Sequence, residues 1–108
     1  MRLLLDESIP AKLGRHLAKH EVRTAVEMGW SGVKNGELLA LAGAGFDAFV
    51  TVDKSMPFQQ NLSTLPIALV VLDSVSNELH VLLALLPRLE QELANLKPKS
   101  YVLVGGYA

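Results

Sequence analysis

The chain has 108 residues, of which half are apolar, so its length and composition predict one globular domain spanning residues 1–108 and exclude a disordered chain. It has no cysteine, which excludes disulfides, thiolate metal sites and thiol nucleophiles and is typical of a reducing, cytoplasmic location. The formal net charge of −1 argues against binding nucleic acid through bulk electrostatics, and no apolar run approaches the roughly 18 residues of a membrane span.

The first half of the chain alternates apolar runs with helix-like segments. Residues 2–6 form an apolar run that stops at an aspartate, which predicts a buried strand. Residues 10–19 have the leucine spacing of an amphipathic helix, with proline in the first turn. Residues 21–26 predict a weaker strand. Residues 35–45 predict a helix that Asn35 caps and that ends in glycines.

The second half continues this alternation. Residues 46–53 and 67–73 are apolar runs that again stop at aspartates, and both predict buried strands. Residues 77–96 predict a long leucine-rich helix that Pro87 must kink or divide. Residues 101–106 predict a last strand that stops at glycines. Strands that alternate with helices in this way predict an α/β domain with a mainly parallel sheet.

Carboxylates recur where the predicted strands end. Asp6, Asp53 and Asp73 each end a strand, and Glu37 opens a helix that can point into the same crevice, where parallel sheets bind their ligands. Such oxygen-rich clusters suit Mg²⁺ or Mn²⁺, which polarise a phosphodiester and activate a water. A cation would also offset the repulsion between Asp6 and Glu7. A single aspartate after a strand is more often a turn residue or a cap, so only the combination predicts a metal-dependent nuclease.

Several segments occur in an order that carries a family resemblance. The segments "LLLDESIP", "EMGWSGVKNGELLALA" and "FVTVDKSM" resemble the small PIN-like nuclease group, bacterial proteins often described as toxin components of toxin–antitoxin pairs. The later "FQQNLSTLPIALVVL" extends the likeness over nearly the whole chain. The resemblance implies a three-layer sandwich with a central, mainly parallel sheet of strand order 3-2-1-4-5. It also implies a ribonuclease that cuts single-stranded RNA with Mg²⁺ or Mn²⁺ and is paired with an antitoxin protein.

The family roles transfer onto particular positions of this chain. Asp6 matches the first acid of the PIN signature and Asp53 the last. Asn35 stands where the family most often has a middle acid, and asparagine can orient a water but supplies no negative charge. Glu37 is therefore the expected third ligand, so the expected catalytic set is Asp6, Glu37, Asp53 and the orienting Asn35. Glu27 could stand for the acid that follows the second strand.

Other charged residues fit structural roles better. Asp73 matches none of the family acids and is expected to be a turn residue. Glu7 is expected to face solvent or to cap the first helix, where its charge suits the helix dipole. His16 and His20 lie four residues apart, but without a third nearby ligand a solvated pair is the better interpretation than a metal site.

Contacts with RNA or with a protein partner are suggested in two places. Trp30 and Phe58 could stack on bases and Gln59 could bond to them, although core packing is the better interpretation for both aromatic residues. The leucines of residues 79–96 are too many for one helix stripe, which favours a homodimer or an antitoxin-like partner.

Two functions of other kinds stay open beside the nuclease. One is a PIN-shaped module that has lost catalysis and binds a protein or RNA, for which Asn35 is the main clue. The other is a hydrolase of small phosphate esters that uses the same acids.

Overall fold

A five-stranded parallel sheet forms the centre of the protein. The computed structural model describes residues 1–105. The strands are β1 (Arg2–Leu5), β2 (Glu21–Thr24), β3 (Ala48–Thr51), β4 (Ala68–Asp73) and β5 (Tyr101–Gly105). The predicted α/β class and mainly parallel sheet are confirmed, and residue 106 of the predicted last strand lies outside the described residues.

The strand order differs from the one that the resemblance implied. The order is β2-β1-β3-β4-β5, so the predicted order 3-2-1-4-5 is wrong. The reason is that β3 is buried at all four residues and needs a neighbour on both edges, whereas β2 exposes Glu21 and Arg23 and suits a sheet edge. In both orders the chain crosses from one side of β1 to the other. The first strand therefore keeps its place at the switch point, where open parallel sheets bind ligands.

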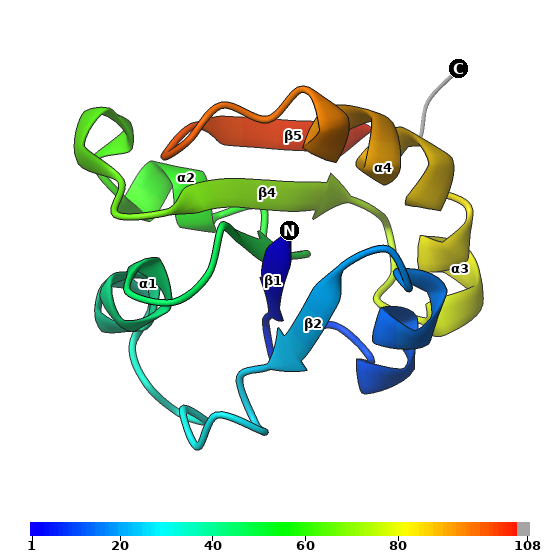
Figure 1. The fold of residues 1–108 in the computed structure, drawn as a ribbon, viewed down its shortest axis with the longest axis horizontal. Coiled ribbons are helices and arrows are strands. Elements are labelled where there is room, and N and C mark those ends of the chain that lie inside the picture. Colours follow the sequence, from blue (N-terminus) through cyan, green and yellow to red (C-terminus); the bar gives the residue numbers. More distant parts are fainter. Residues whose placement is uncertain (106–108) are drawn as a thin grey trace.

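Helical segments lie on both faces of this sheet. They are the 3₁₀-helices η1 (Ala11–His16) and η2 (Leu62–Thr64) and the α-helices α1 (Asn35–Gly43), α2 (Met56–Gln59), α3 (Leu79–Leu83) and α4 (Leu86–Ala94). Figure 1 shows α1 and α2 on one side of the sheet and α3 and α4 on the other. Among residues 1–105, no helix is long and apolar enough to cross a membrane.

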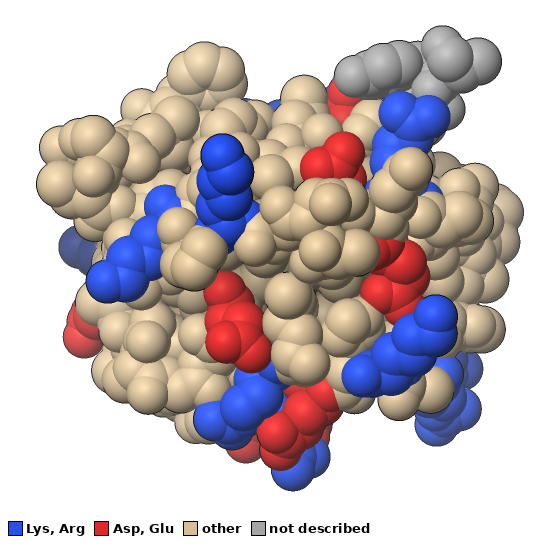
Figure 2. Space-filling model, turned by 45° about the horizontal axis from the view of Figure 1, so that its top comes forward, with Lys and Arg blue, Asp and Glu red and all other residues tan. Residues whose placement is uncertain are grey.

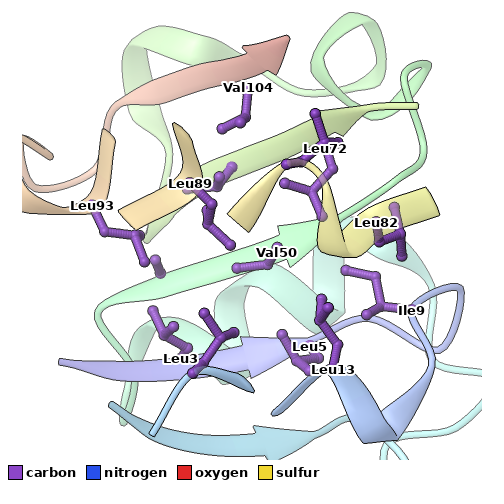
Figure 3. Packing of buried hydrophobic residues seen from close by; sticks show 14 of the residues in the cluster. Leu3, Leu5, Ile9, Leu13, Val50, Leu72, Leu82, Leu89, Leu93 and Val104 are labelled. Carbon is purple, nitrogen blue, oxygen red and sulfur yellow. The ribbon is translucent and has the colours of Figure 1, made fainter. Parts of the chain in front are cut away.

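Alternate residues of each strand supply two separate hydrophobic clusters. In β1, Leu3 and Leu5 belong to one cluster and Leu4 to the other, as expected for side chains that point to opposite faces of a sheet. The first cluster also contains leucines from η1, α3 and α4 (Figure 3). The second contains Phe49 of β3 together with α1 and Met56 of α2. Burial of these side chains on both faces explains why the strands read as continuous apolar runs.

The first predicted helix is shorter and tighter than its leucine pattern suggests. Only Ala11–His16 is helical, and it is a 3₁₀-helix. Gly14 lies in its middle, where glycine disfavours an α-helix, and a Cβ there would lie 3.2 Å from Val22 Cγ1. The close packing of this turn against β2 therefore explains why the helix is short and tight. Leu13 and Leu17 are still buried, as their spacing predicts.

The predicted leucine-rich helix is divided in two, as expected from Pro87. It divides into α3 and α4, and Pro87 lies in the first turn of α4, where its missing N–H costs no helical hydrogen bond. The leucines of the two helices pack against the sheet. Those buried in the first cluster are Leu82, Leu85, Leu89 and Leu93, and those packed beside it are Leu79, Leu83, Leu86 and Leu96. The excess of leucine is thus accounted for inside the domain, and a homodimer or antitoxin partner stays a prediction.

Candidate functional site

Asp6 follows β1 directly and accepts hydrogen bonds from several donors. Its Oδ1 accepts from the Glu7 N–H at 2.8 Å, and its Oδ2 accepts from Ser8 Oγ at 2.8 Å and from Thr51 Oγ1 at 2.7 Å. The Asp6 N–H donates to the Val50 carbonyl at 2.9 Å, which fixes the backbone against β3. A carboxylate has about four lone-pair positions, so one remains for a further ligand. The side chain is half-buried.

Asp53 is joined to Asp6 through a single side chain. The Thr51 hydroxyl, which is fully buried, donates to Asp6 and accepts from the Asp53 N–H at 3.0 Å. Asp53 Oδ1 accepts from Ser55 N at 2.9 Å and from Ser55 Oγ at 2.6 Å. Because β1 and β3 are parallel neighbours, the two aspartates lie at the same edge of the sheet.

Asn35 is connected to the same edge. It was expected to cap α1, but Lys34 takes the cap position without a side-chain bond and Asn35 is the first helical residue. Its Nδ2 donates to Gln59 Oε1 at 3.3 Å, and Gln59 Nε2 donates to Ser55 Oγ at 3.2 Å. Each hydrogen bond in this series is donated in the direction that leads from Asn35 toward Asp6. This strand-end network consists of Asp6, Thr51, Asp53, Ser55, Gln59 and Asn35.

Glu37 is not part of the strand-end network. It is exposed on α1 two residues after Asn35, which places it roughly 200° around the helix axis from Asn35. Its carboxylate has no hydrogen bond or ion pair within residues 1–105. Its role as the third ligand stays a prediction.

The strand-end network offers few of the ligands that a protein site for a divalent cation usually has. In the described part of the chain, no group of three or more His, Cys, Asp or Glu residues is arranged to hold a metal ion. Mg²⁺, however, is commonly held by one or two carboxylates together with several waters. Asp6 and Asp53 supply two carboxylates at one sheet edge, and both side chains are half-buried rather than enclosed. The chemistry of these oxygen donors fits Mg²⁺ or Mn²⁺.

Glu7 turns away from Asp6 and fixes the loop that follows β2. Its Oε1 accepts from the Gly32 N–H at 2.9 Å and its Oε2 from Ser31 Oγ at 3.0 Å. Gly32 has a φ of 80°, a conformation that glycine adopts without strain. The two adjacent carboxylates near the start of the chain therefore use separate sets of donors. Glu7 is exposed to solvent, as expected, and it does not cap η1.

A pH dependence of stability is expected from Glu7. The Gly32 N–H and then the Ser31 hydroxyl lower the pKa of this carboxyl below its usual value of 4.5. A lowered pKa stabilises the fold above pH 4.5, and this stabilisation is lost as the pH falls through the lower folded-state value. In urea unfolding, the natural chain should be more stable than Glu7→Gln at pH 7, and the difference should close in acid. An equal difference at both pH values would contradict this role.

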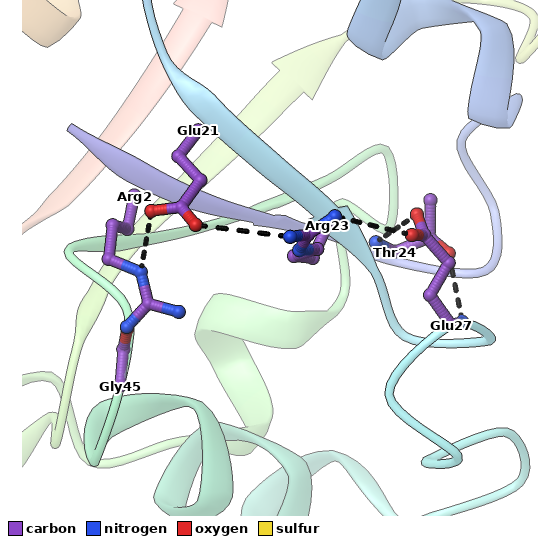
Figure 4. A network of polar contacts seen from close by, with 6 residues as sticks. All are labelled: Arg2, Glu21, Arg23, Thr24, Glu27 and Gly45. Carbon is purple, nitrogen blue, oxygen red and sulfur yellow. Dashed lines mark hydrogen bonds and ion pairs between the residues drawn. The ribbon is translucent and has the colours of Figure 1, made fainter.

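Two other acids have local partners. Glu27 Oε1 accepts from the Thr24 N–H at 3.1 Å while the Glu27 N–H donates to Thr24 Oγ1 at 3.0 Å, and Arg23 lies 3.9 Å away (Figure 4). Glu27 therefore closes the turn after β2. Asp73 is the last residue of β4 and not the turn residue that was expected, and its Oδ1 pairs with Lys54 Nζ at 2.9 Å.

The two histidines do not form the predicted surface pair. His16 ends η1 and is exposed, whereas His20 lies beyond the helix. His20 Nε2 lies 2.5 Å from Glu90 Oε1 of α4, and its buried Nδ1 has no partner in the described structure. His20 therefore joins the start of β2 to α4.

The structure adds residues that the sequence reasoning missed. The sequence pattern predicts no role for Thr51 or Ser55, and for Gln59 it predicts only a contact to bases. The signal for the first two is local: Thr51 precedes Asp53 by two positions and Ser55 follows it by two, a spacing at which short polar side chains bond across turns. Comparisons with models of protein families, with curated proteins and with solved structures find no match for this chain.

Proposed function

We propose that this protein is a PIN-like ribonuclease that hydrolyses RNA phosphodiesters with Mg²⁺ or Mn²⁺, in a domain of three-layer sandwich form. The observation that carries the proposal is that Asp6 and Asp53 follow two neighbouring parallel strands, with the buried Thr51 hydroxyl bonded to the Asp6 carboxylate and to the Asp53 backbone N–H. This is the switch point of the sheet, where ligands of open α/β folds bind.

Each residue of the strand-end network has a part in the proposed reaction. Asp6 and Asp53 would hold the cation, with Glu37 as the proposed third ligand. A bound Mg²⁺ or Mn²⁺ would polarise the phosphodiester and activate a water for attack. Thr51 orients Asp6, and Ser55 orients Asp53 through its Oδ1. Asn35 donates through Nδ2 to Gln59, which leaves its carbonyl oxygen to orient a water.

The surface charge suits local contacts with RNA rather than a broad basic surface. Figure 2 shows lysines and arginines interspersed with acids on the face that it presents. The net charge of the chain is −1. Substrate binding would therefore depend on a few side chains near the strand-end network, and its affinity should fall only modestly with added salt.

Removal of the cation is the direct test. The purified chain is expected to cut a fluorescently labelled single-stranded RNA in the presence of Mn²⁺ or Mg²⁺, to stop in excess EDTA, and to recover when Mn²⁺ is restored. The physical reason is that the cation would activate the attacking water and offset the negative charge that develops on the phosphate. Gel analysis of the products measures the rate. Cleavage that continues unchanged in EDTA would contradict the proposal.

A catalytically weak or inactive PIN-like module is the second candidate. It is favoured by Asn35, which brings an amide in place of a third carboxylate into the strand-end network. Calorimetry with Mn²⁺ separates the two candidates. A nuclease should lose Mn²⁺ affinity when Asp6 or Asp53 is replaced by asparagine, whereas an inert module should bind Mn²⁺ no differently after either change.

The biological setting belongs to the same proposal. The PIN-like resemblance suggests a cytoplasmic toxin component whose activity an antitoxin protein restrains. A homodimer is a further proposal, which size-exclusion chromatography at micromolar concentration tests directly.

A further inference from the structure

Phe58 is the one highly exposed aromatic side chain among residues 1–105. It is 90% exposed. Trp30 packs edge-on against Phe46 with ring centroids 6.3 Å apart, as expected for a core pair, and Phe49 is fully buried. Tyr101 packs beside the second hydrophobic cluster. Phe58 alone among these aromatic residues places a large apolar ring in water, contrary to the core packing expected from its sequence, which leaves the face of the ring free for a ligand.

The position of this ring is tied to the strand-end network. The Met56 N–H donates to the Asp53 carbonyl at 3.2 Å, and the Phe58 N–H donates to the Ser55 carbonyl at 3.0 Å. Met56 and Pro57 are buried and anchor α2 to the domain. Two residues after Met56 on a helical turn, Phe58 points outward. The exposed ring is therefore held on a short, anchored segment that begins at Asp53.

The surroundings of the ring are polar and match a nucleotide. Lys54, Ser55, Gln59 and Asn61 near it in the chain are exposed and carry an ammonium, a hydroxyl and two amides. A protein-docking surface would present contiguous apolar side chains, and of the other exposed large hydrophobic residues only Leu62, 42% exposed, lies close to Phe58 in the chain. An unpaired base offers a flat π-face to the ring and hydrogen-bonding edges to the amides.

We infer that Phe58 forms a stacking subsite for an unpaired base of single-stranded RNA beside the strand-end network. This inference rests on the proposed function, since it states how that function would hold its substrate. Stacking on an aromatic ring tolerates any base, so the subsite selects single strands over duplexes rather than a sequence.

The experiment measures binding without cleavage. A fluorescein-labelled 2′-O-methyl RNA oligonucleotide is titrated with the natural chain and with Phe58→Leu and Phe58→Trp, all in EDTA, and anisotropy gives the Kd. Phe58→Leu keeps an apolar side chain but removes the π-face, so the Kd should rise by about 5- to 150-fold, the range for loss of one base stack. Phe58→Trp should bind at least as tightly as the natural chain. A 2-aminopurine base in the oligonucleotide should be quenched by the natural chain and not by Phe58→Leu.

The matched control is Val75→Ala, because Val75 is 98% exposed but aliphatic, and its Kd should be unchanged. Equal binding by Phe58→Leu and the natural chain would overturn the inference, as would no binding by the natural chain or equal binding of a duplex. In those cases a protein partner is the better occupant of this surface. Because the assay runs in EDTA on an oligonucleotide that cannot be cut, it reports on Phe58 whether or not the cleavage test succeeds.

Discussion

Asp6→Asn is expected to lower the rate of metal-dependent RNA cleavage by about 100-fold or more, because loss of a residue that only orients a metal ligand already costs about 10- to 100-fold. The amide has the size of the carboxylate but one acceptor oxygen and no charge. Its single oxygen can replace only one of the two carboxylate oxygens, so either the Glu7 N–H or both the Ser8 and Thr51 hydroxyls lose their acceptor. The rate is measured on labelled single-stranded RNA at saturating Mn²⁺.

The control for this variant is Asp47→Asn. Asp47 is an exposed aspartate just before β3, at the amino end of the sheet, where its Oδ2 accepts from the Arg2 N–H at 2.7 Å. The same substitution there should leave cleavage unchanged. Thermal unfolding should show that Asp6→Asn stays folded, since lost hydrogen bonds cost about 1–3 kcal/mol against a total stability of about 5–15 kcal/mol. Equal rates for Asp6→Asn and the natural chain would sink the nuclease proposal.

Phe49→Ala is expected to lower the free energy of unfolding by about 3–5 kcal/mol, the usual cost of truncating a buried aromatic side chain. Phe49 is fully buried in β3, opposite Leu4 of β1 and Leu69 of β4. All three belong to the second hydrophobic cluster, so truncation leaves a cavity between sheet and helices. Urea unfolding followed by circular dichroism measures the change.

Phe58→Ala makes the matched comparison for stability. The same atoms are removed from a side chain that is 90% exposed, so the free energy of unfolding should change by less than about 0.5 kcal/mol. A loss as large as that of Phe49→Ala would show that the Phe58 ring packs against the domain, and it would count against the stacking subsite as well.

The sequence pattern predicted the strands well and their arrangement poorly. Continuous apolar runs report burial on both faces, which is a local property, so four strands were found from such runs, whereas β2, which exposes Glu21 and Arg23, was predicted only weakly. The strand order depends on which edge of β1 accepts β3, and that choice is made by contacts between residues far apart in the chain. The tight packing of Gly14 against Val22, which shortened the first helix, is likewise invisible to a leucine pattern.

Part of the candidate site could likewise be predicted from the sequence, and part of it could not. Asp6 and Asp53 could be placed because the end of a strand is readable locally, and a parallel sheet then brings its strand ends to one edge. The bond from Thr51 to Asp6 joins two strands, and no pattern in either strand contains it. Phe58 was expected in the core because its type is usually buried, but α2 turns Met56 inward and Phe58 outward. Which residue of so short a helix faces inward is decided by the surrounding fold.

The central place of β1 has a consequence for synthesis on the ribosome. One edge of β1 pairs with β2, and the other pairs with β3, which comes later in the chain. The Arg2 N–H likewise donates to Asp47, which is 45 residues away in sequence. Parallel neighbours cannot form a hairpin, so each pairing needs a closed crossover, which slows folding. A nascent chain that stalls before β3 emerges would hold three consecutive leucines on an open edge, a template for aggregation that the finished protein hides.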